Sequence, residues 1–480
     1  MTKILVANRG EIACRILRTL RDMGISSVAV HSEADKDSPH VDEADEAVQV
    51  EGNDPAKSYL NIQGLLEAAG RTGATAIHPG YGFLSTNARF ATACERAKLT
   101  FIGPTAAAMT TLGDKRSARS TAERCGIPVI PGARECDSPE AAQAIADRVG
   151  YPILVKAAGG GGGRGLRQVD EAAGLPEAFA AARREAESSF RDGRMLVEKF
   201  IHPARHIEIQ ILGDGKKAVA FGERECSLQR RFQKIIEESP SPAVSGSLRA
   251  ALSDAAERLA VAAGYSNAGT VEFLLGPDGA WYFLEVNARL QVEHPITEAR
   301  FGIDLVRAQV ELALGGSLPA PAEPRGHAIE ARINAEDPAR DFLPMTGRVA
   351  ALRWPHRPDL RVDAGLREGQ EILPWFDPLL GKIIAWGPDR EWARRRLLGG
   401  LRDLVLAGVP TNQRFLIDTL ESDFFVQGET FTTTLESQSW TPPEPSKAML
   451  VAAATAAAPP APKSKSASPW RTRGSWRMGS

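Results

Sequence analysis

Five side chains that could do chemistry lie within one short stretch of the sequence: Asn287, Arg289, Gln291, Glu293 and His294. The stretch follows the apolar run 281–286, which predicts a strand. A core segment avoids such groups, because each buried polar group without a partner costs about 1–3 kcal/mol. A solvated loop would not explain the apolar strand that leads into it. Polar clusters at strand ends are common positions for binding and catalysis, so the sequence predicts a site here.

A run of five glycines, residues 159–163, lies upstream of this stretch. Glycine lets backbone N–H groups approach phosphate oxygens and lets a flap move. The alternative is a flexible linker, but linkers rarely follow a run as rich in β-formers as residues 151–156. It is not a Walker loop, because the Gly-Lys-Ser/Thr ending is missing. With the polar stretch, it suggests an ATP-dependent enzyme that acts on a small anion.

Weaker hints of phosphate binding come from two lysines and from the first predicted turn. Lys115 and Lys156 are candidate phosphate ligands, although a lone lysine is usually a solvated charge. Residues 8–11 follow the first predicted strand but lack the glycine pattern that a bound dinucleotide needs. A structural turn is the simpler interpretation of that segment.

Two predicted strands, residues 269–275 and 280–287, flank a turn signal at residues 276–279. If Pro277 and Asp278 form the loop, Glu272 lies opposite Phe283. In the same register, Thr270 lies opposite Glu285.

Since cross-strand partners share a face, Glu272, Glu285 and Asn287 are expected to lie together. Two carboxylates and an amide form a hard-oxygen set suited to Mg²⁺ or Mn²⁺ beside ATP phosphates. The alternative is a solvated hairpin face.

Residues 205–211 alternate between apolar and polar side chains, as a strand with one buried face does. Ile207, Ile209 and Ile211 are expected to face a core, and the opposite face carries His206, Glu208 and Gln210. The alternative is an ordinary half-exposed strand.

The elements that must position these residues form several domains, since 480 residues exceed one compact core. Residues 1–112 read as α/β: strand 4–7, a helix with Ile12, Ile16 and Leu20 on one stripe that stops at Gly24, and strand 27–30, which implies a parallel sheet. Residues 113–325 are expected to form an α+β region, and residues 326–440 a third unit that opens with strand 326–333. Residues 441–480, rich in Pro, Ala, Ser and Lys, are expected to be a disordered linker.

The composition excludes several classes of protein. The formal net charge of −2 leaves no nucleic-acid footprint, and no apolar run reaches the ~18 residues that span a bilayer. The sequence starts directly in a predicted strand, so no secretory signal is expected. Five scattered cysteines without a Cys-x-x-Cys pair favour a reduced cytoplasmic compartment.

Several motifs, in their order along the chain, closely resemble biotin carboxylase, the ATP-grasp component of acyl-CoA carboxylases. The resemblance runs from about residue 3 to about residue 435. The segments that carry it are residues 4–13 (ILVANRGEIA), 78–84 (HPGYGFL), the glycine run, 223–231 (ERECSLQRR), 291–295 (QVEHP) and 332–337 (RINAED).

The resemblance implies an N-terminal Rossmann-like domain, an ATP-grasp domain with a glycine-rich lid at about residues 131–203, and a C-terminal biotin carboxylase domain. The nucleotide positions are matched by Lys115, Lys156, Gly162, Gly163, Glu198, Lys199, Phe200, Ile201, His206 and Gln229. The metal positions are matched by Glu272, Glu285 and Asn287. The bicarbonate pocket is matched by Lys234, Arg289, Gln291, Val292 and Glu293, and Arg332 matches the arginine that faces the ureido oxygen of biotin.

The implied reaction is the carboxylation of carrier-linked biotin with ATP and bicarbonate. Glu293 would deprotonate bicarbonate, which attacks the γ-phosphate to give carboxyphosphate, and Arg332 would stabilise the biotin enolate. The chain departs from the family pattern at Phe232, where a histidine is usual, at Thr86, where a glutamate is usual, and at Ala288, where threonine or proline is usual.

The resemblance also implies partners. The sequence has no Met-Lys-Met biotin-attachment motif, and residues 447–449 match it poorly, so the biotin carrier is expected elsewhere. A carboxyltransferase subunit and a homodimer are further expectations, and residues 468–477 resemble the start of the region that follows this module in fused subunits. Two alternatives stay open: another ATP-grasp ligase, such as half of a carbamoyl-phosphate synthetase, and a degenerate nucleotide-binding scaffold.

Overall fold

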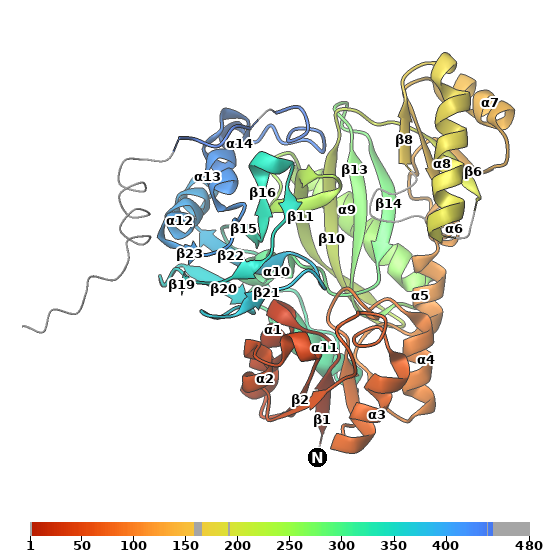
Figure 1. Cartoon of the computed structure of the whole chain (residues 1–480). Coiled ribbons are helices and arrows are strands. Elements are labelled where there is room, and N and C mark those ends of the chain that lie inside the picture. Colours follow the sequence, from red (N-terminus) through yellow and green to blue (C-terminus); the bar gives the residue numbers. More distant parts are fainter. Residues whose placement is uncertain (1, 158–165, 191–192, 439, 445–480) are drawn as a thin grey trace, which may run out of the picture. The chain divides into compact units, whose positions relative to one another are not determined.

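The computed structural model describes residues 2–157, 166–190, 193–438 and 440–444 (Figure 1). The chain divides into two units, residues 1–439 and 440–480. Apart from residues 441–444, which form neither helix nor strand, the predicted linker lies outside the described residues, as does the glycine run.

The N-terminal region is built on a five-stranded parallel sheet with strand order β3-β2-β1-β4-β5. Its elements are β1 (Lys3–Val6), α1 (Gly10–Asp22), β2 (Ser26–His31), α2 (Pro39–Glu43), β3 (Glu46–Gln49), α3 (Ile62–Thr72), β4 (Ala76–His78), α4 (Ala88–Arg96) and β5 (Thr100–Phe101). Ile12, Ile16 and Leu20 of α1 are buried, as their spacing predicts. The predicted βαβ unit is therefore confirmed.

A small four-stranded sheet, with order β6-β9-β7-β8, has its own apolar core. It consists of β6 (Gly132–Cys136), α7 (Pro139–Val149), β7 (Ile153–Ala157), β8 (Leu166–Val169), α8 (Leu175–Phe190) and β9 (Met195–Lys199). Ile153 and Val155 of β7 enter this core with Phe179 of α8. The alternation of β7 places Lys156 on the opposite face. Helices α5 (Ala106–Gly113) and α6 (Lys115–Arg124) precede the sheet.

The largest sheet is antiparallel and has eight strands in the order β14-β13-β10-β11-β12-β15-β22-β20. Their bounds are β10 (Arg205–Asp214), β11 (Ala218–Arg230), β12 (Gln233–Ser239), β13 (Ser266–Leu275), β14 (Trp281–Asn287), β15 (His327–Asn334), β20 (Leu360–Ala364) and β22 (Leu379–Gly387). The β12–β15 ladder makes the sheet continuous across residue 326, the expected boundary between two domains.

Helices α9 (Gly246–Ala262), α10 (His294–Phe301) and α11 (Leu305–Ala313) connect strands of this central sheet, and α12 (Arg390–Asp403), α13 (Gln413–Glu421) and α14 (Asp423–Gln427) follow it. Short strand pairs complete this part: β16 (Glu336–Asp337) with β17 (Leu343–Pro344), β18 (Gly347–Arg348) with β21 (Glu371–Ile372), and β19 (Ala351–Arg353) with β23 (Val405–Ala407). Within the described residues, none of the helices combines the length and apolar character of a membrane span.

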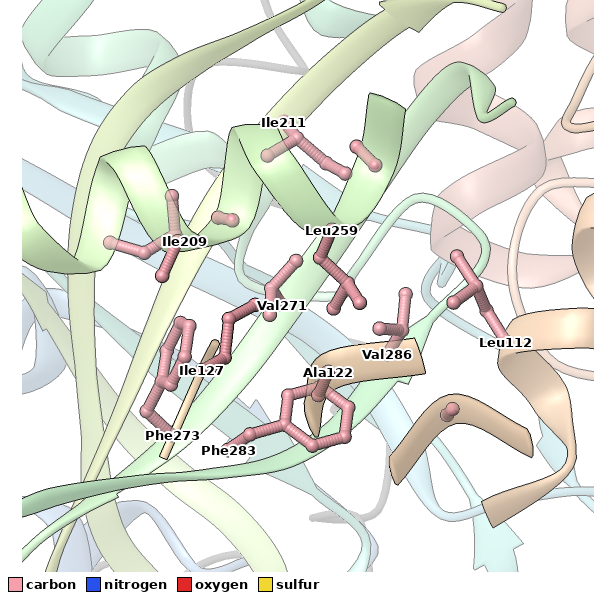
Figure 2. Close-up of a cluster of buried hydrophobic side chains, with 14 of the residues drawn as sticks. Leu112, Ala122, Ile127, Ile209, Ile211, Leu259, Val271, Phe273, Phe283 and Val286 are labelled. Atoms are coloured by element: carbon pink, nitrogen blue, oxygen red, sulfur yellow. The ribbon is translucent and has the colours of Figure 1, made fainter. Parts of the chain in front are cut away.

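One face of strand β10 enters the main apolar core. Figure 2 shows Ile209 and Ile211 beside Leu259 of α9 and Val271 of β13. The predicted core face is thus confirmed. The opposite face carries three polar side chains that are also buried: His206, Glu208 and Gln210. The half-exposed alternative is therefore wrong, and buried polar groups at these positions need partners.

The predicted register of the β13–β14 hairpin was wrong by two residues. Glu272 pairs with Glu285 rather than with Phe283, and Thr270 pairs with Asn287. The shift is an even number, so Glu272, Glu285 and Asn287 still share one face.

The turn and a β-bulge each account for one residue of this shift. The loop spans residues 276–280 rather than two residues, because Leu275 pairs with Trp281 and the Gly276 amide donates to the Ala280 carbonyl at 2.8 Å. The bulge lies between the pairs of Glu272 and Phe273. Neither feature has a signal in the sequence that fixes its length.

Candidate active site

A pocket of about 590 Å³ lies between the small sheet and the central sheet. It brings together most of the residues singled out in the sequence. Those that line it are Lys115, Lys156, Lys199, Phe200, Ile201, His206, Gln229, Lys234, Glu272, Glu285, Asn287, Arg289, Gln291, Val292 and Arg332. Glu198 and Glu293 contact lining residues from behind, and Gly162 and Gly163 lie outside the described residues.

Lys234 is the centre of the ion pairs at the floor of this pocket. Its Nζ donates to Glu208 at 2.5 Å, to Glu293 at 2.7 Å and to Glu272 at 2.9 Å. Burial alone would lower the pKa of Lys234, but the three carboxylates raise it well above the usual value. The ammonium group therefore stays charged, as a ligand for an anion must.

Glu293 lies at the N-terminus of α10, between two cations. Besides Lys234, its carboxylate accepts a hydrogen bond from Arg332 Nη2 at 2.9 Å. Burial would raise the pKa of Glu293, yet Lys234 and Arg332 hold it well below the usual range. Glu293 is thus an ionised carboxylate that carries no proton.

The loop after β14 places three polar groups at one wall of the pocket. Arg289 donates through Nη1 to Gln291 Oε1 at 2.7 Å and through Nη2 to Asn287 Oδ1 at 3.0 Å. Gln291 in turn donates to Glu272 Oε1 at 2.9 Å. The carbonyl of Val292 accepts from the buried Lys382 at 2.6 Å. These bonds fix the loop, so the Arg289 guanidinium faces the pocket in one orientation.

The predicted metal set lies on adjacent strands. Asn287 Nδ2 donates to Glu272 Oε1 at 2.8 Å, and Glu285 is the ladder partner of Glu272. Lys115 Nζ lies 3.7 Å from Glu285 Oε2. Burial raises the pKa of Glu272, but Lys234 and His206 outweigh it and keep the group ionised. Two carboxylates and an amide carbonyl fit the oxygen ligands that Mg²⁺ prefers.

The small sheet supplies the other wall. Lys156 Nζ donates to Glu198 Oε2 at 2.5 Å, and Arg119 Nη1 donates to the other oxygen at 2.8 Å. The Lys199 amine instead donates to the carbonyls of Gly150 and Tyr151, at 3.1 and 2.7 Å. Two of the three N–H donors of its ammonium group are therefore already used.

Phe200 and Ile201 follow β9 and line the pocket on the same side. The Phe200 amide donates to the carbonyl of Pro152 at 3.0 Å, and its ring stacks on His202 at 5.5 Å. Deeper in, Gln229 Nε2 lies 3.1 Å from His206 Nδ1. This wall combines apolar surface with a few polar groups, as nucleotide pockets do.

Three family models match the chain along nearly its whole length. They are the biotin carboxylase N-terminal domain over residues 1–109, the carbamoyl-phosphate synthase L chain ATP-binding domain over 114–321, and the biotin carboxylase C-terminal domain over 330–437. A biotin carboxylase from Nostoc is 45% identical over 442 residues, which cover 91% of this chain and 99% of that protein. The chain belongs to the biotin carboxylase family.

Longer carboxylase subunits and solved structures agree with this assignment. The methylcrotonoyl-CoA carboxylase α subunit of Dictyostelium discoideum is 46% identical over 435 residues, which cover 89% of this chain but 62% of that subunit. A solved dimer of the biotin carboxylase domain of Hydrogenobacter thermophilus 2-oxoglutarate carboxylase, in complex with MgADP, ADP and bicarbonate, superposes with a TM-score of 0.87 at 40% identity. The superposition covers 91% of this chain and 97% of the Hydrogenobacter chain. The predicted fold class is confirmed, and the chain is an ATP-dependent ligase of the biotin carboxylase type.

Sequence patterns assign no role to several charged side chains beneath this biotin carboxylase site. Arg224 is fully buried, donates to Glu208, and also donates to Gln210, Thr297 and Thr270 at 2.8–3.0 Å. Glu208 was recognised only as part of an alternating strand. The buried Arg224 guanidinium, with its hydrogen bonds satisfied, fixes the Glu208 carboxylate, and Glu208 in turn binds Lys234.

A second group without a predicted role surrounds Phe232, the residue where the family usually has histidine. Phe232 lies at the tip of the β11–β12 hairpin, lines the pocket and is 55% exposed. Arg231 and Phe232 both have positive φ, which side chains rarely adopt. Arg230 and Arg231 each pair with Asp341 and so hold this tip. Strained turns of this kind are common near functional sites.

Proposed function

We propose that the chain uses ATP and bicarbonate to carboxylate biotin on a carrier, through carboxyphosphate. The observation that carries this proposal is the position of Glu293. It is an ionised carboxylate held between Lys234 and Arg332, at the edge of a pocket whose other wall suits a nucleotide. The proposed anion site and phosphate site would share one cavity, and the proposed base would lie directly beside it.

Glu293 is the proposed base for bicarbonate. Bicarbonate would bind to Arg289 and Lys234, whose charges neutralise it, beside the Gln291 side chain and the Val292 backbone. Removal of its proton by Glu293 makes it a nucleophile for the γ-phosphate of ATP. These groups line or adjoin the pocket whose other wall carries Lys156, which supports a reaction between the two sheets.

Lys115, Lys156 and His206 are the proposed phosphate ligands, and Glu198 to Ile201 would hold the adenine side together with Gln229. Glu272, Glu285 and Asn287 would hold Mg²⁺ or Mn²⁺, which neutralises charge on the transferred phosphoryl group when bound. The glycines at 162 and 163 complete the proposed nucleotide site.

Arg332 is the proposed ligand of the biotin ureido oxygen. Carboxyphosphate would break down to CO₂ and phosphate, the phosphate would take the ureido proton, and the ureido nitrogen would attack CO₂ to form carboxybiotin. The negative charge that develops on the ureido oxygen would lie against the guanidinium, which is stabilising in a site screened from water.

The wider assignments remain proposals. The domain division is 1–112, 113–325 with its lid, and 326–440. The partners are a biotin carrier, a carboxyltransferase subunit and a second copy of the chain. A cytoplasmic location is supported by cysteines that are all free within the described structure.

The test is ADP release from ATP with and without bicarbonate and with and without free biotin. We expect hydrolysis that requires bicarbonate and Mg²⁺ and increases with biotin, together with formation of carboxybiotin. Hydrolysis that ignores both bicarbonate and biotin would contradict the proposal and favour a nucleotide-binding scaffold. Formation of carbamoyl phosphate with ammonia would instead favour the other ATP-grasp ligase.

A further inference from the structure

Two buried carboxyl groups without a place in this reaction lie behind Arg332. Glu237 of β12 and Glu330 of β15 are ladder partners, so their side chains leave the sheet side by side on one face. Arg332 is two residues beyond Glu330 and shares that face. Both carboxyl groups are fully buried.

These groups have fewer donors than two carboxylates require. Glu237 Oε1 accepts a hydrogen bond from Arg332 Nε at 2.6 Å and lies 2.5 Å from Arg332 Nη2 in an ion pair. The other oxygen of Glu237 and both oxygens of Glu330 have no hydrogen-bond partner among the described protein atoms. A buried carboxylate without a donor is costly, and such a group binds a proton instead.

The neighbouring cationic side chains already bind other groups. Besides Glu237, Arg332 binds Glu293, with 2.9 Å between Nη2 and the carboxylate oxygen. Lys382, from the adjacent strand β22, donates to the Val292 carbonyl and lies 3.3 Å from Glu11. All three donors of Lys234 are used by Glu208, Glu272 and Glu293. No cation in the described structure makes an ion pair with Glu330.

We propose that Glu237 and Glu330 share one proton and that the pair acts as a positioning element for Arg332. The O–H of one carboxyl would donate to the other, which leaves a single negative charge behind the guanidinium. Arg332 would then face one full carboxylate, Glu293, and a half-neutralised pair. It would keep both a fixed orientation and enough positive charge for the biotin ureido oxygen. The effect on catalysis rests on the proposed function, whereas the shared proton does not.

The electrostatics support this arrangement. Burial raises the pKa of Glu237 to about 7, although Arg332 and Lys234 oppose the shift and Glu293 adds to it. Burial also raises the pKa of Glu330 well above its usual value, with Glu237 and Glu293 adding to the shift and Lys382 and Arg332 opposing it. Two buried carboxyl groups at paired positions of one ladder do not both ionise readily.

Infrared spectroscopy tests the shared proton directly. We expect wild-type protein at neutral pH to show the carbonyl stretch of a protonated carboxylic acid that is lost in Glu330→Gln, since the introduced amide can donate its N–H to Glu237. Glu238→Gln is the matched control. Glu238 is next on the same strand and binds His327 and Arg390, and these ion pairs keep its pKa low against burial. A difference spectrum of wild type minus Glu330→Gln without that band would overturn the shared proton.

Kinetics test the positioning role. Glu237→Leu should lower the kcat of biotin carboxylation about 10- to 150-fold, the value of a charged hydrogen bond, and leave biotin-independent ATP hydrolysis within about threefold. Glu237→Gln, whose amide oxygen can still accept from Arg332, should recover most of the loss. Equal losses in both assays, or no recovery with glutamine, would overturn it. Wild-type protein without any bicarbonate-dependent ATPase would contradict the proposed function instead, and the infrared result would still stand.

Discussion

The two walls of the pocket are held in different ways. Beside the central sheet, the Glu293 carboxylate at the N-terminus of α10 binds both Lys234 of β12 and Arg332 of β15, which are far apart in the sequence. On the small sheet, Lys156 and Glu198 lie on strands with a separate apolar core. The links from α6 and its flanks to the neighbouring regions include the bond from Arg119 to Glu198 and the bridge between Val129 and Phe283.

This difference suggests that one wall serves catalysis and the other serves nucleotide binding. Charges that are paired before a ligand arrives need little reorganisation during the reaction, which is how a preorganised site lowers the activation barrier. A wall with its own core can adjust to a nucleotide without disturbing those pairs. Substitutions of the paired charges Lys234, Glu293 and Arg332 should therefore act on kcat, and those on the small sheet on the KM for ATP.

The largest expected effect is on the central sheet. Glu293→Gln should reduce the kcat of bicarbonate-dependent ATP turnover roughly 10²- to 10⁴-fold, because it removes the base. Nucleotide affinity, measured by titration calorimetry, should stay nearly the same. Glu311→Gln, an exposed change on α11, is the control. A kcat within about threefold of wild type would contradict the assignment of Glu293.

The next largest effect separates biotin carboxylation from ATP hydrolysis on the same sheet. Arg332→Ala should lower the kcat of biotin carboxylation roughly 10²- to 10³-fold, as the loss of an oxyanion ligand does. Biotin-independent ATP hydrolysis should change far less, since Arg332 is proposed to act on biotin and not on phosphate. The two assays run on the same preparation decide this. Parallel losses would place the arginine in the phosphate chemistry.

On the small sheet, Lys156→Met should raise the KM for ATP about 10- to 150-fold, because a charged hydrogen bond to phosphate is lost. Steady-state kinetics at saturating ATP should recover most of kcat. The matched control is Arg167→Met on the adjacent strand β8, where the arginine is exposed and pairs with Glu185. A fall in kcat without a change in KM would remove the distinction between the two walls.

The smallest effect is at the hairpin tip that carries Phe232. Phe232→His should lower the KM for ATP about two- to tenfold, since one neutral hydrogen bond is worth about 0.5–1.5 kcal/mol. The value of kcat should stay nearly constant, because the contact is made in the ground state. An increase in kcat by orders of magnitude would instead mean that Phe232 impairs the chemical step itself.

Local patterns predicted much of this molecule. The stripe of Ile12, Ile16 and Leu20 predicted α1, and the alternation after Arg205 predicted the core face of β10. The even spacing of Glu285 and Asn287 predicted a shared face with Glu272, even though the register was wrong. These features depend on the spacing of apolar side chains, about 3.6 residues in a helix and two in a strand, which can be read directly from the sequence.

Long-range pairing was not predictable in the same way. Arg332 binds Glu237, which lies 95 residues earlier in the sequence. The ladder between β12 and β15 joins segments on either side of residue 326, which the sequence predicted to be a domain boundary. Arg224 carries no pattern that marks it as buried, because its partners come from three other elements. The metal role of Glu272, Glu285 and Asn287 was predicted from the hairpin, whereas the roles of Lys234, Glu293 and Arg332 came from a family resemblance.

The continuity of the central sheet limits how a gene for this enzyme can be divided. A break between residues 314 and 326 falls in a loop, where proteins usually tolerate cuts. Here it would leave β12 as an open edge in one fragment and β15 in the other, and unpaired edges of this kind promote aggregation. Chimeric carboxylases should therefore fold when residues 1–439 come from a single parent protein. They should misfold when the junction between the two parents is placed at residue 326.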